Sequence, residues 1–121
     1  MTTNLAALTF DANDPARLAR FWAATLGWDI DDTQEAITVV PTDGTSFPLA
    51  FLPVPEPKAG KNRIHLDLVS EDPEHQAEVV DRLIALGASC VDVGQPEDAE
   101  HVVLADPCPG RVQRRPVHCL R

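Results

Sequence analysis

The stretch FDANDPARLARFWAATLGW, residues 10–28, decides the fold because it contains a helix with signals at both of its ends. Asp14 suits the N-cap, where a carboxylate accepts hydrogen bonds from unpaired amides, and Pro15 suits the first helical position, which needs no N–H. Gly27 suits the left-handed residue that ends a helix. Apolar residues recur at helical spacing between these signals, so we predict a helix that packs on a sheet through Leu18, Phe21, Trp22 and Leu26.

The same signals return later in the chain and reveal an internal repeat. Asp72-Pro73 and Gly87 repeat Asp14-Pro15 and Gly27, and the two Asp-Pro pairs lie 58 residues apart, at positions 14 and 72. A second apolar stripe follows the second pair, so we predict a second helix of the same kind. This stripe consists of Val79, Val80, Leu83 and Ile84.

Strand-like segments surround each predicted helix. Residues 5–11 and 64–69 alternate in polarity before the helices, and residues 53–62 form a connector whose three prolines and one glycine cannot continue a strand. We therefore predict an α+β fold in one domain, residues 1–121, built from two βαβββ modules (1–57 and 62–121) that form a curved mixed sheet around a central cleft. The remaining predicted strands are 28–31, 36–40, 48–52, 89–93, 101–105 and a poor, proline-containing one near 112–119.

The final segment leaves several alternatives open. Prolines weaken the last predicted strand, so the chain from Cys108 to Arg121 is an edge strand, a disordered tail or a strand that pairs with another subunit. The last eleven residues contain four arginines and no acid. They form either a solvated basic tail or an interaction tail.

Composition excludes several classes of partner. The net charge of −9 argues against nucleic acid, whose phosphates would repel the protein. No apolar run approaches the roughly 20 residues that span a bilayer, and the three cysteines lack the spacing of a disulfide framework. We expect a cytoplasmic protein with no membrane partner.

Two polar residues of the second module are candidates for chemistry. Alternation along residues 63–69 places His65 and Asp67 on the strand face turned away from the helix. Such a pair can ligate a metal ion or act as a base with its orienting carboxylate, and the alternative is a histidine that only hydrogen-bonds a neighbour. The 58-residue offset superposes Ala7 on His65 and Thr9 on Asp67. Cys108, His118 and Cys119 lack the close pairs of a zinc site.

Four segments together resemble a known family: residues 10–28, 54–68 (VPEPKAGKNRIHLDL), 83–88 (LIALGA) and 102–107 (VVLADP). They are similar to the glyoxalase/bleomycin-resistance/extradiol-dioxygenase family, the vicinal oxygen chelate superfamily, and most of all to its glyoxalase-like branch common in actinobacteria. The resemblance implies paired βαβββ modules around a cleft. It also implies a small-molecule ligand and a homodimer, because members often dimerise. Members include metal-dependent isomerases, epimerases and dioxygenases, and metal-free proteins that bind drugs.

The resemblance also indicates where metal ligands would stand. Metal-using members take one ligand from the first strand of each module and others from the last strands, the final one often Glu. Of these positions only His65 carries a side chain that can bind a metal ion, since its first-module counterpart is Ala7. The resemblance therefore disfavours a divalent metal cofactor. The remaining ligand positions carry Ala50 or Phe51, and Gln113 or Arg114.

Two functions follow as hypotheses. The first is a binding module for a small organic molecule. Its carboxylates would favour a cationic or hydroxylated ligand. The alternative is an enzyme (a lyase, isomerase or dioxygenase-like protein) in which His65, oriented by Asp67, supplies acid–base chemistry or binds a metal ion. The predicted substrate-binding residues are Thr9, Asp11, Phe51 and Arg63, beside His65 and Asp67.

Overall fold

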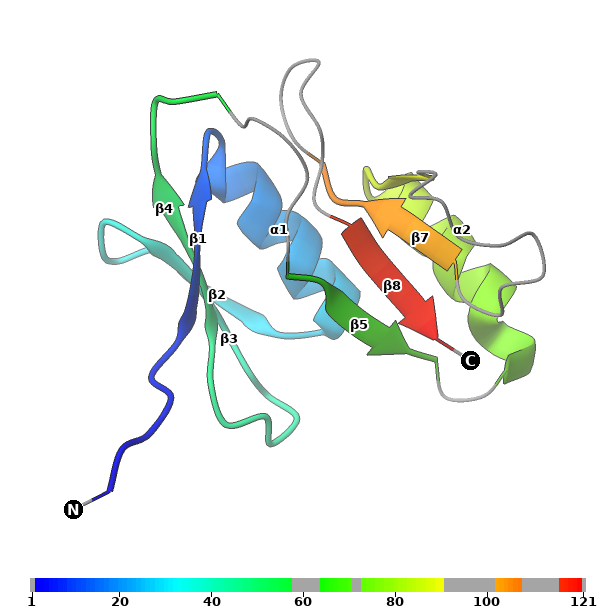
Figure 1. Cartoon of the computed structure of the whole chain (residues 1–121), viewed down its shortest axis with the longest axis horizontal. Helices are drawn as coiled ribbons and strands as arrows, with labels where there is room; N and C mark the ends of the chain where they lie inside the picture. The colour runs from blue at the N-terminus through cyan, green and yellow to red at the C-terminus, as the bar shows by residue number, and fades with distance from the viewer. Residues whose placement is uncertain (1, 58–63, 71–72, 91–101, 108–115, 121) are drawn as a thin grey trace. The chain divides into compact units, whose positions relative to one another are not determined.

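The computed structural model describes residues 2–57, 64–70, 73–90, 102–107 and 116–120. The chain divides into two compact units, Met1–Lys58 and Ala59–Arg121, each with its own sheet and helix (Figure 1). The first unit contains β1 (Leu8–Ala12), α1 (Pro15–Leu26), β2 (Asp29–Asp31), β3 (Ile37–Val40) and β4 (Leu49–Pro53). The second contains β5 (Leu66–Val69), the 3₁₀ turn η1 (Pro73–His75), α2 (Gln76–Ala85), β6 (Ser89–Cys90), β7 (Val102–Ala105) and β8 (Pro116–Leu120).

The two sheets have the same topology. Their strand orders are β1-β4-β3-β2 and β5-β8-β7-β6. In both, the last strand runs parallel to the first and antiparallel to the third. The first strands begin at Leu8 and Leu66, which are 58 residues apart. The predicted repeat and the α+β fold with βαβββ modules are confirmed.

Helix α1 forms as its end signals predict. The Asp14 side chain accepts a hydrogen bond from the Arg17 amide (3.1 Å), and Pro15 is the first helical residue. Gly27 has φ 72° and ψ 29°, the left-handed conformation, and its N–H donates to the Ala23 carbonyl at 2.8 Å. Glycine adopts this conformation without the clash that a Cβ creates, so the helix ends here.

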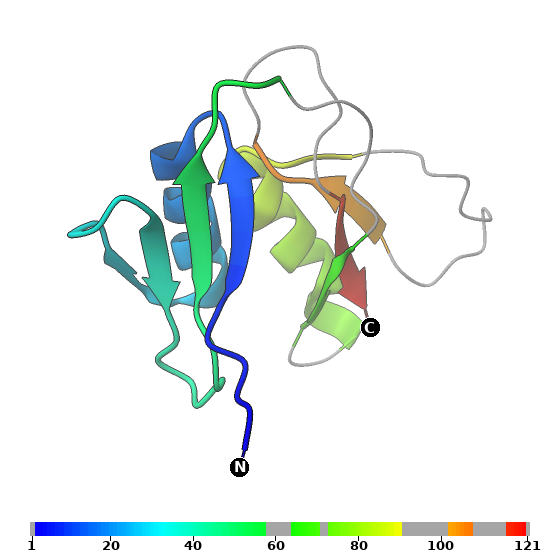
Figure 2. The same cartoon turned by 60° about the vertical axis from the view of Figure 1, so that its left-hand side comes forward.

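The first unit buries its core between α1 and one face of its sheet. In Figure 2, α1 lies behind β1 and β4. Phe10 pairs with Phe51 in register, and their rings stack with centroids 5.6 Å apart. The helix contributes Trp22 and Phe21 in edge-to-face contact. The buried apolar residues of this unit are Ala12, Leu18, Ala19, Phe21, Trp22, Ala23, Val39, Leu49, Ala50 and Phe51.

Helix α2 differs from the prediction at its start and on its apolar stripe. The 3₁₀ turn η1 occupies the positions expected to be the first helical residues, and the α-helix begins at Gln76. Tight 3₁₀ turns are common at helix N-termini. Of the predicted stripe only Leu83 is fully buried, while Ile84 is 42% exposed. The predicted left-handed glycine is confirmed by Gly87, which has φ 118°.

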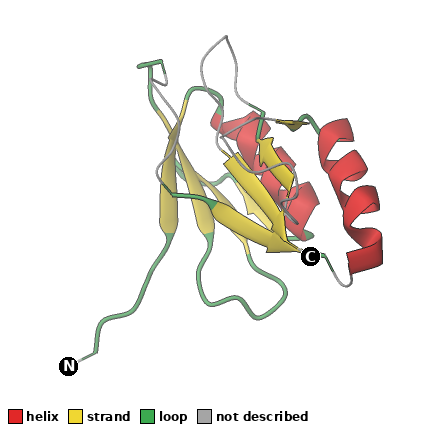
Figure 3. Ribbon diagram, turned by 45° about the vertical axis from the view of Figure 1, so that its right-hand side comes forward, coloured by secondary structure: helices red, strands yellow, loops and turns green. Residues whose placement is uncertain are grey.

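The final strand is more regular than its sequence indicates. Strand β8 lies between β5 and β7, with Leu66 opposite Val117 and Val103 opposite His118 (Figures 1 and 3). The alternatives of an edge strand or a disordered tail are therefore wrong for residues 116–120. Pro116 is the first residue of the strand, a position that needs no donated ladder hydrogen bond.

The predicted connector is anchored where it begins. The Asn13 side-chain amide donates to the carbonyls of Val54 and Glu56, both at 2.9 Å. The Val54 amide donates to the Ala12 carbonyl at 2.9 Å. Strand β4 therefore ends against the turn that starts α1. No helix within the described residues is long and apolar enough to cross a membrane.

Candidate functional site

Strand β1 presents a polar edge on the sheet face that α1 leaves uncovered. Thr9 and Asp11 are exposed and alternate with Leu8 and Phe10, which face the helix. Their partners in register on β4 are Ala50 and Leu52. Thr9 and Asp11 therefore share one face of the first sheet.

Phe51 does not lie with them. It pairs with Phe10, stacks on it and is 0% exposed, so it lies on the helix-covered face. The prediction that Phe51 lines a site together with Thr9 and Asp11 is corrected by this register. The strand reads Leu-Ala-Phe-Leu, and such a run has no alternation that would indicate which residue faces which side.

The second unit places the His-Asp pair at the beginning of its first strand. His65 directly precedes β5, Asp67 lies within it, and both are exposed. Leu66 and Leu68 alternate with them and are half-buried. Arg63, the remaining predicted binding residue, lies outside the described residues, and so do Gln113 and Arg114.

One register relation could not be obtained from the sequence. Because β8 runs parallel beside β5, Asp67 stands opposite His118 in the backbone register. Sequence reasoning considered His118 only with the two cysteines near it. The prolines and glycine of residues 107–116 indicated only a poor last strand, so its pairing with β5 could not be assigned from the sequence.

A second polar cluster joins the end of α1 to the turn before β4. The Trp28 indole N–H donates to Asp43 Oδ2 at 3.0 Å, and the Thr42 hydroxyl donates to the Gly27 carbonyl at 3.0 Å. Hydrogen bonds from the Thr45 side chain, from Trp28 and from the Thr45 amide lower the pKa of Asp43 below its usual 3.8. These contacts give Trp28 and Asp43 a structural role in this turn.

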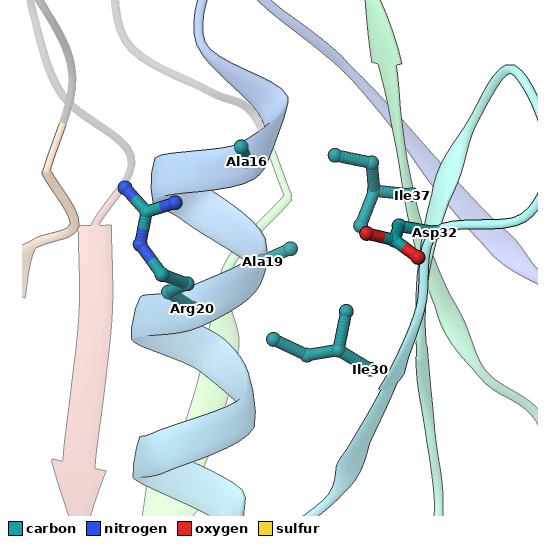
Figure 4. A pocket seen from close by; sticks show the side chains of 6 residues that line it. All are labelled: Ala16, Ala19, Arg20, Ile30, Asp32 and Ile37. Carbon is teal, nitrogen blue, oxygen red and sulfur yellow. The ribbon is translucent and has the colours of Figure 1, made fainter.

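The first unit also contains a pocket that the sequence did not predict. It lies between α1 and strands β2 and β3, with a volume of about 230 Å³ (Figure 4). It is on the helix-covered face, because Ile30 pairs with the fully buried Val39. Thr9 and Asp11 lie on the opposite face of the same sheet. The lining residues are Ala16, Ala19, Arg20, Ile30, Asp32 and Ile37.

With this geometry established, comparisons with known proteins identify the family. The sequence model of the glyoxalase-like domain matches residues 7–111, most of the chain. The chain belongs to the glyoxalase-like domain family. This confirms the resemblance to the glyoxalase, bleomycin-resistance and dioxygenase superfamily, while the actinobacterial branch stays a prediction. No curated protein matches the chain.

Solved structures support the fold. A glyoxalase/bleomycin resistance protein/dioxygenase family enzyme from Burkholderia phytofirmans is 15% identical, with a TM-score of 0.73 over 97% of each chain. A possible glyoxalase from Bacillus cereus is 15% identical, with a TM-score of 0.70 over 99% of this chain and all of its own. The fosfomycin resistance protein FosX from Mesorhizobium loti is 14% identical, with a TM-score of 0.68 over 99% of this chain and 92% of its own. At these identities the likeness shows the fold alone.

The residues of the first unit do not fit the metal site found in some glyoxalase-like proteins. Ala7, the counterpart of His65, has only a methyl group, and Ala50 on β4 has no donor atom either. Phe51 faces the core. Among the described residues, no three His, Cys, Asp or Glu side chains gather closely enough to hold a metal ion.

Proposed function

We propose that this glyoxalase-like domain binds a small organic molecule through the polar residues on the first strand of each unit, without a metal site of the family's standard kind. The observation that carries the proposal is the structural equivalence of Leu8 and Leu66, the first residues of β1 and β5. It makes Ala7 the counterpart of His65. A metal ion that needs about three protein ligands therefore lacks its first-unit donor.

The exposed groups favour a ligand with hydroxyl groups or positive charge. Asp11 and Asp67 are exposed carboxylates, which accept hydrogen bonds and attract cations, and Thr9 and His65 offer further hydrogen-bonding groups. Proteins of similar structure include a fosfomycin resistance protein and a glyoxalase/bleomycin resistance protein/dioxygenase family enzyme, which supports a small organic molecule as the ligand. The cleft that the sequence predicts between the modules remains part of this proposal.

The test combines metal analysis with a ligand screen on the purified full chain. We expect elemental analysis to find no stoichiometric Ni, Mn, Zn, Fe or Co, and ligand-observed NMR to detect hydroxylated or cationic molecules. A tightly bound stoichiometric ion that His65→Ala releases would overturn the metal-free part of the proposal.

A matched pair of variants tests the binding residues. Asp67→Asn should weaken binding of any such ligand by about two- to fivefold, the range of an exposed charge interaction. Asp81→Asn removes the same charge from the exposed surface of α2 and should leave the affinity unchanged. Equal affinity of the two variants would remove Asp67 from the site.

The alternative function is catalysis by His65, which lies two residues from Asp67 with both side chains exposed. In that case His65 would act as general acid or base and Asp67 would orient its ring. Once a ligand is known, His65→Ala should keep its affinity and lose its turnover. If neither changes, His65 has a structural role only.

A further inference from the structure

We infer that the pocket between α1 and strands β2 and β3 of the first unit binds a small organic cation with an apolar ring or chain. This site is separate from the proposed ligand site, because it lies on the opposite face of the sheet from Thr9 and Asp11. Its lining, its size and its charge each support this assignment.

The walls of the pocket are apolar. Ile30 on β2 and Ile37 on β3 pair with Val39 and Phe51, two fully buried residues, so both isoleucines face α1. Ile30 is nevertheless 44% exposed. The exposed part of Ile30 adds apolar surface to the pocket wall that a ligand would bury.

The space exists because α1 carries small side chains at this point. The residues of α1 that face the isoleucines are Ala16 and Ala19, whose side chains are single methyl groups (Figure 4). The resulting volume of about 230 Å³ exceeds the roughly 150 Å³ of an engineered protein cavity that holds benzene. A six-membered ring with a short charged arm therefore fits.

A carboxylate at the rim selects a positive charge. In Figure 4 the carboxylate of Asp32 points toward the helix across the pocket, whereas the Arg20 guanidinium points away from both isoleucines. The neighbouring Asp31 accepts hydrogen bonds from the Thr33 hydroxyl (2.6 Å) and amide (3.0 Å). Within the described part of the chain, Asp32 makes no such bond, so its oxygens are available to a ligand.

The surrounding sequence strengthens this selection. Residues 29–40 contain four acidic side chains, those of Asp29, Asp31, Asp32 and Glu35, and no basic one. The resulting negative potential favours an ammonium group at the pocket mouth and opposes a carboxylate or phosphate. The combination of apolar walls with one charged group at the rim is typical of sites for small organic molecules.

The probe is benzylammonium, with benzyl alcohol as a neutral molecule of nearly the same shape. Both are titrated into the ¹⁵N-labelled full chain and followed by amide chemical shifts. We expect benzylammonium to bind in the millimolar range, as suits so few atoms, and to shift the amides of Ala16, Ala19, Ile30 and Ile37. Benzyl alcohol should bind about two- to fivefold more weakly, because it lacks the charge.

Three variants test the assignment. Asp32→Asn should weaken benzylammonium binding to the level of benzyl alcohol. Asp29→Asn is the matched control, because Asp29 alternates with Ile30 and lies on the other face of β2, and it should lower the benzylammonium affinity much less than Asp32→Asn does. Ala16→Leu, at a half-buried position near the start of α1, should fill the pocket and abolish binding of both probes.

The results that would overturn the inference are equally specific. They are equal affinity for the two probes, equal effects of Asp32→Asn and Asp29→Asn, or unchanged binding to a folded Ala16→Leu protein. Shifts confined to Thr9, Asp11 or the His65–Asp67 segment would assign the probe to the proposed ligand site instead. Failure of the proposed ligand site leaves the shifts at Ala16 and Ile30 unaffected, so the two proposals are tested independently.

Discussion

The two units share a topology but differ in how their helices are held. Helix α1 has a side-chain cap from Asp14 at its start and a left-handed Gly27 at its end. Five of its residues are buried. Helix α2 follows a 3₁₀ turn, its N-cap residue His75 makes no side-chain capping hydrogen bond, and Leu83 is its only buried residue among those described.

This difference shows that the same signals at the two ends of a helix can accompany very different degrees of burial. Asp-Pro before each helix and Leu-Gly after it locate both helices to within a few residues. The signals do not determine how much of each helix is buried, because burial depends on the volume of the apolar residues. The first helix carries Phe21 and Trp22, whereas the second carries only aliphatic residues in its stripe.

The largest expected effect separates the two helices at equivalent positions. Trp22 is 2% exposed, and Trp22→Ala should lower the free energy of unfolding by about 3–5 kcal/mol through loss of buried area and cavity formation. Val80, its counterpart 58 residues later, is half-buried, and Val80→Ala should cost about 1 kcal/mol. Urea denaturation of both variants measures the difference. Equal losses would mean that the two helices are equally well packed.

The second expected effect runs in the opposite direction. Gly87 has φ 118°, and a Cβ there would lie 3.3 Å from the Cβ of the buried Pro107. A Cβ on Gly27, with φ 72°, would meet nothing within 4 Å. Gly87→Ala should therefore cost about 2–3 kcal/mol and Gly27→Ala about 1 kcal/mol, both by thermal or urea unfolding. A reversed order would contradict the conformation described for the turn after α2.

A smaller effect tests the helix starts. Asp14→Ala removes the acceptor of the Arg17 amide and should lower stability by about 1 kcal/mol. His75→Ala should lower it less, because this residue makes no side-chain capping hydrogen bond. Asp14→Asn, which keeps a capping oxygen, is the control and should recover most of the loss. Comparable losses from Asp14→Ala and His75→Ala would show that the caps do not distinguish the helices.

The smallest effect concerns the turn that closes α1. The pKa of Asp43 is lowered, so its hydrogen bonds stabilise the fold above pH 3.8 and lose this contribution as the pH falls through the lower folded value. An NMR titration of the carboxyl carbon should give a midpoint below 3.8. Trp28→Phe should raise that midpoint, while the Thr45 donors remain. The midpoint of Asp31, whose pKa is lowered by Thr33, should not change in this variant.

Much of the fold could be predicted from the sequence because it depends on local signals. Asp14, Pro15 and Gly27 act through backbone geometry within one turn, and the repeat copies that arrangement. The central position of β8 could not be predicted, since it depends on pairing with β5, more than forty residues earlier in the chain. The prolines and arginines around it indicated only a poor strand near 112–119, with an edge strand or a disordered tail among the alternatives.

The candidate site was predictable only where polar and apolar residues alternate. Thr9 and Asp11 were assigned correctly to one face because they alternate with Leu8 and Phe10, which face the helix. Phe51 was placed wrongly because all of its neighbours on β4 are apolar. The pocket was not predicted because it results from the small side chains of Ala16 and Ala19. A pattern of polar and apolar residues does not show where small side chains leave space.

The position of β8 has a consequence for synthesis on the ribosome. The first sheet has all of its strands once residue 53 has emerged, whereas β5 and β7 lack their shared neighbour until residues 116–120 leave the exit tunnel. Strand edges that wait for a partner are open to pairing with other chains. The nascent second unit therefore has unpaired strand edges for longer than the first, and a stop codon before residue 116 would leave β5 and β7 without their shared neighbour.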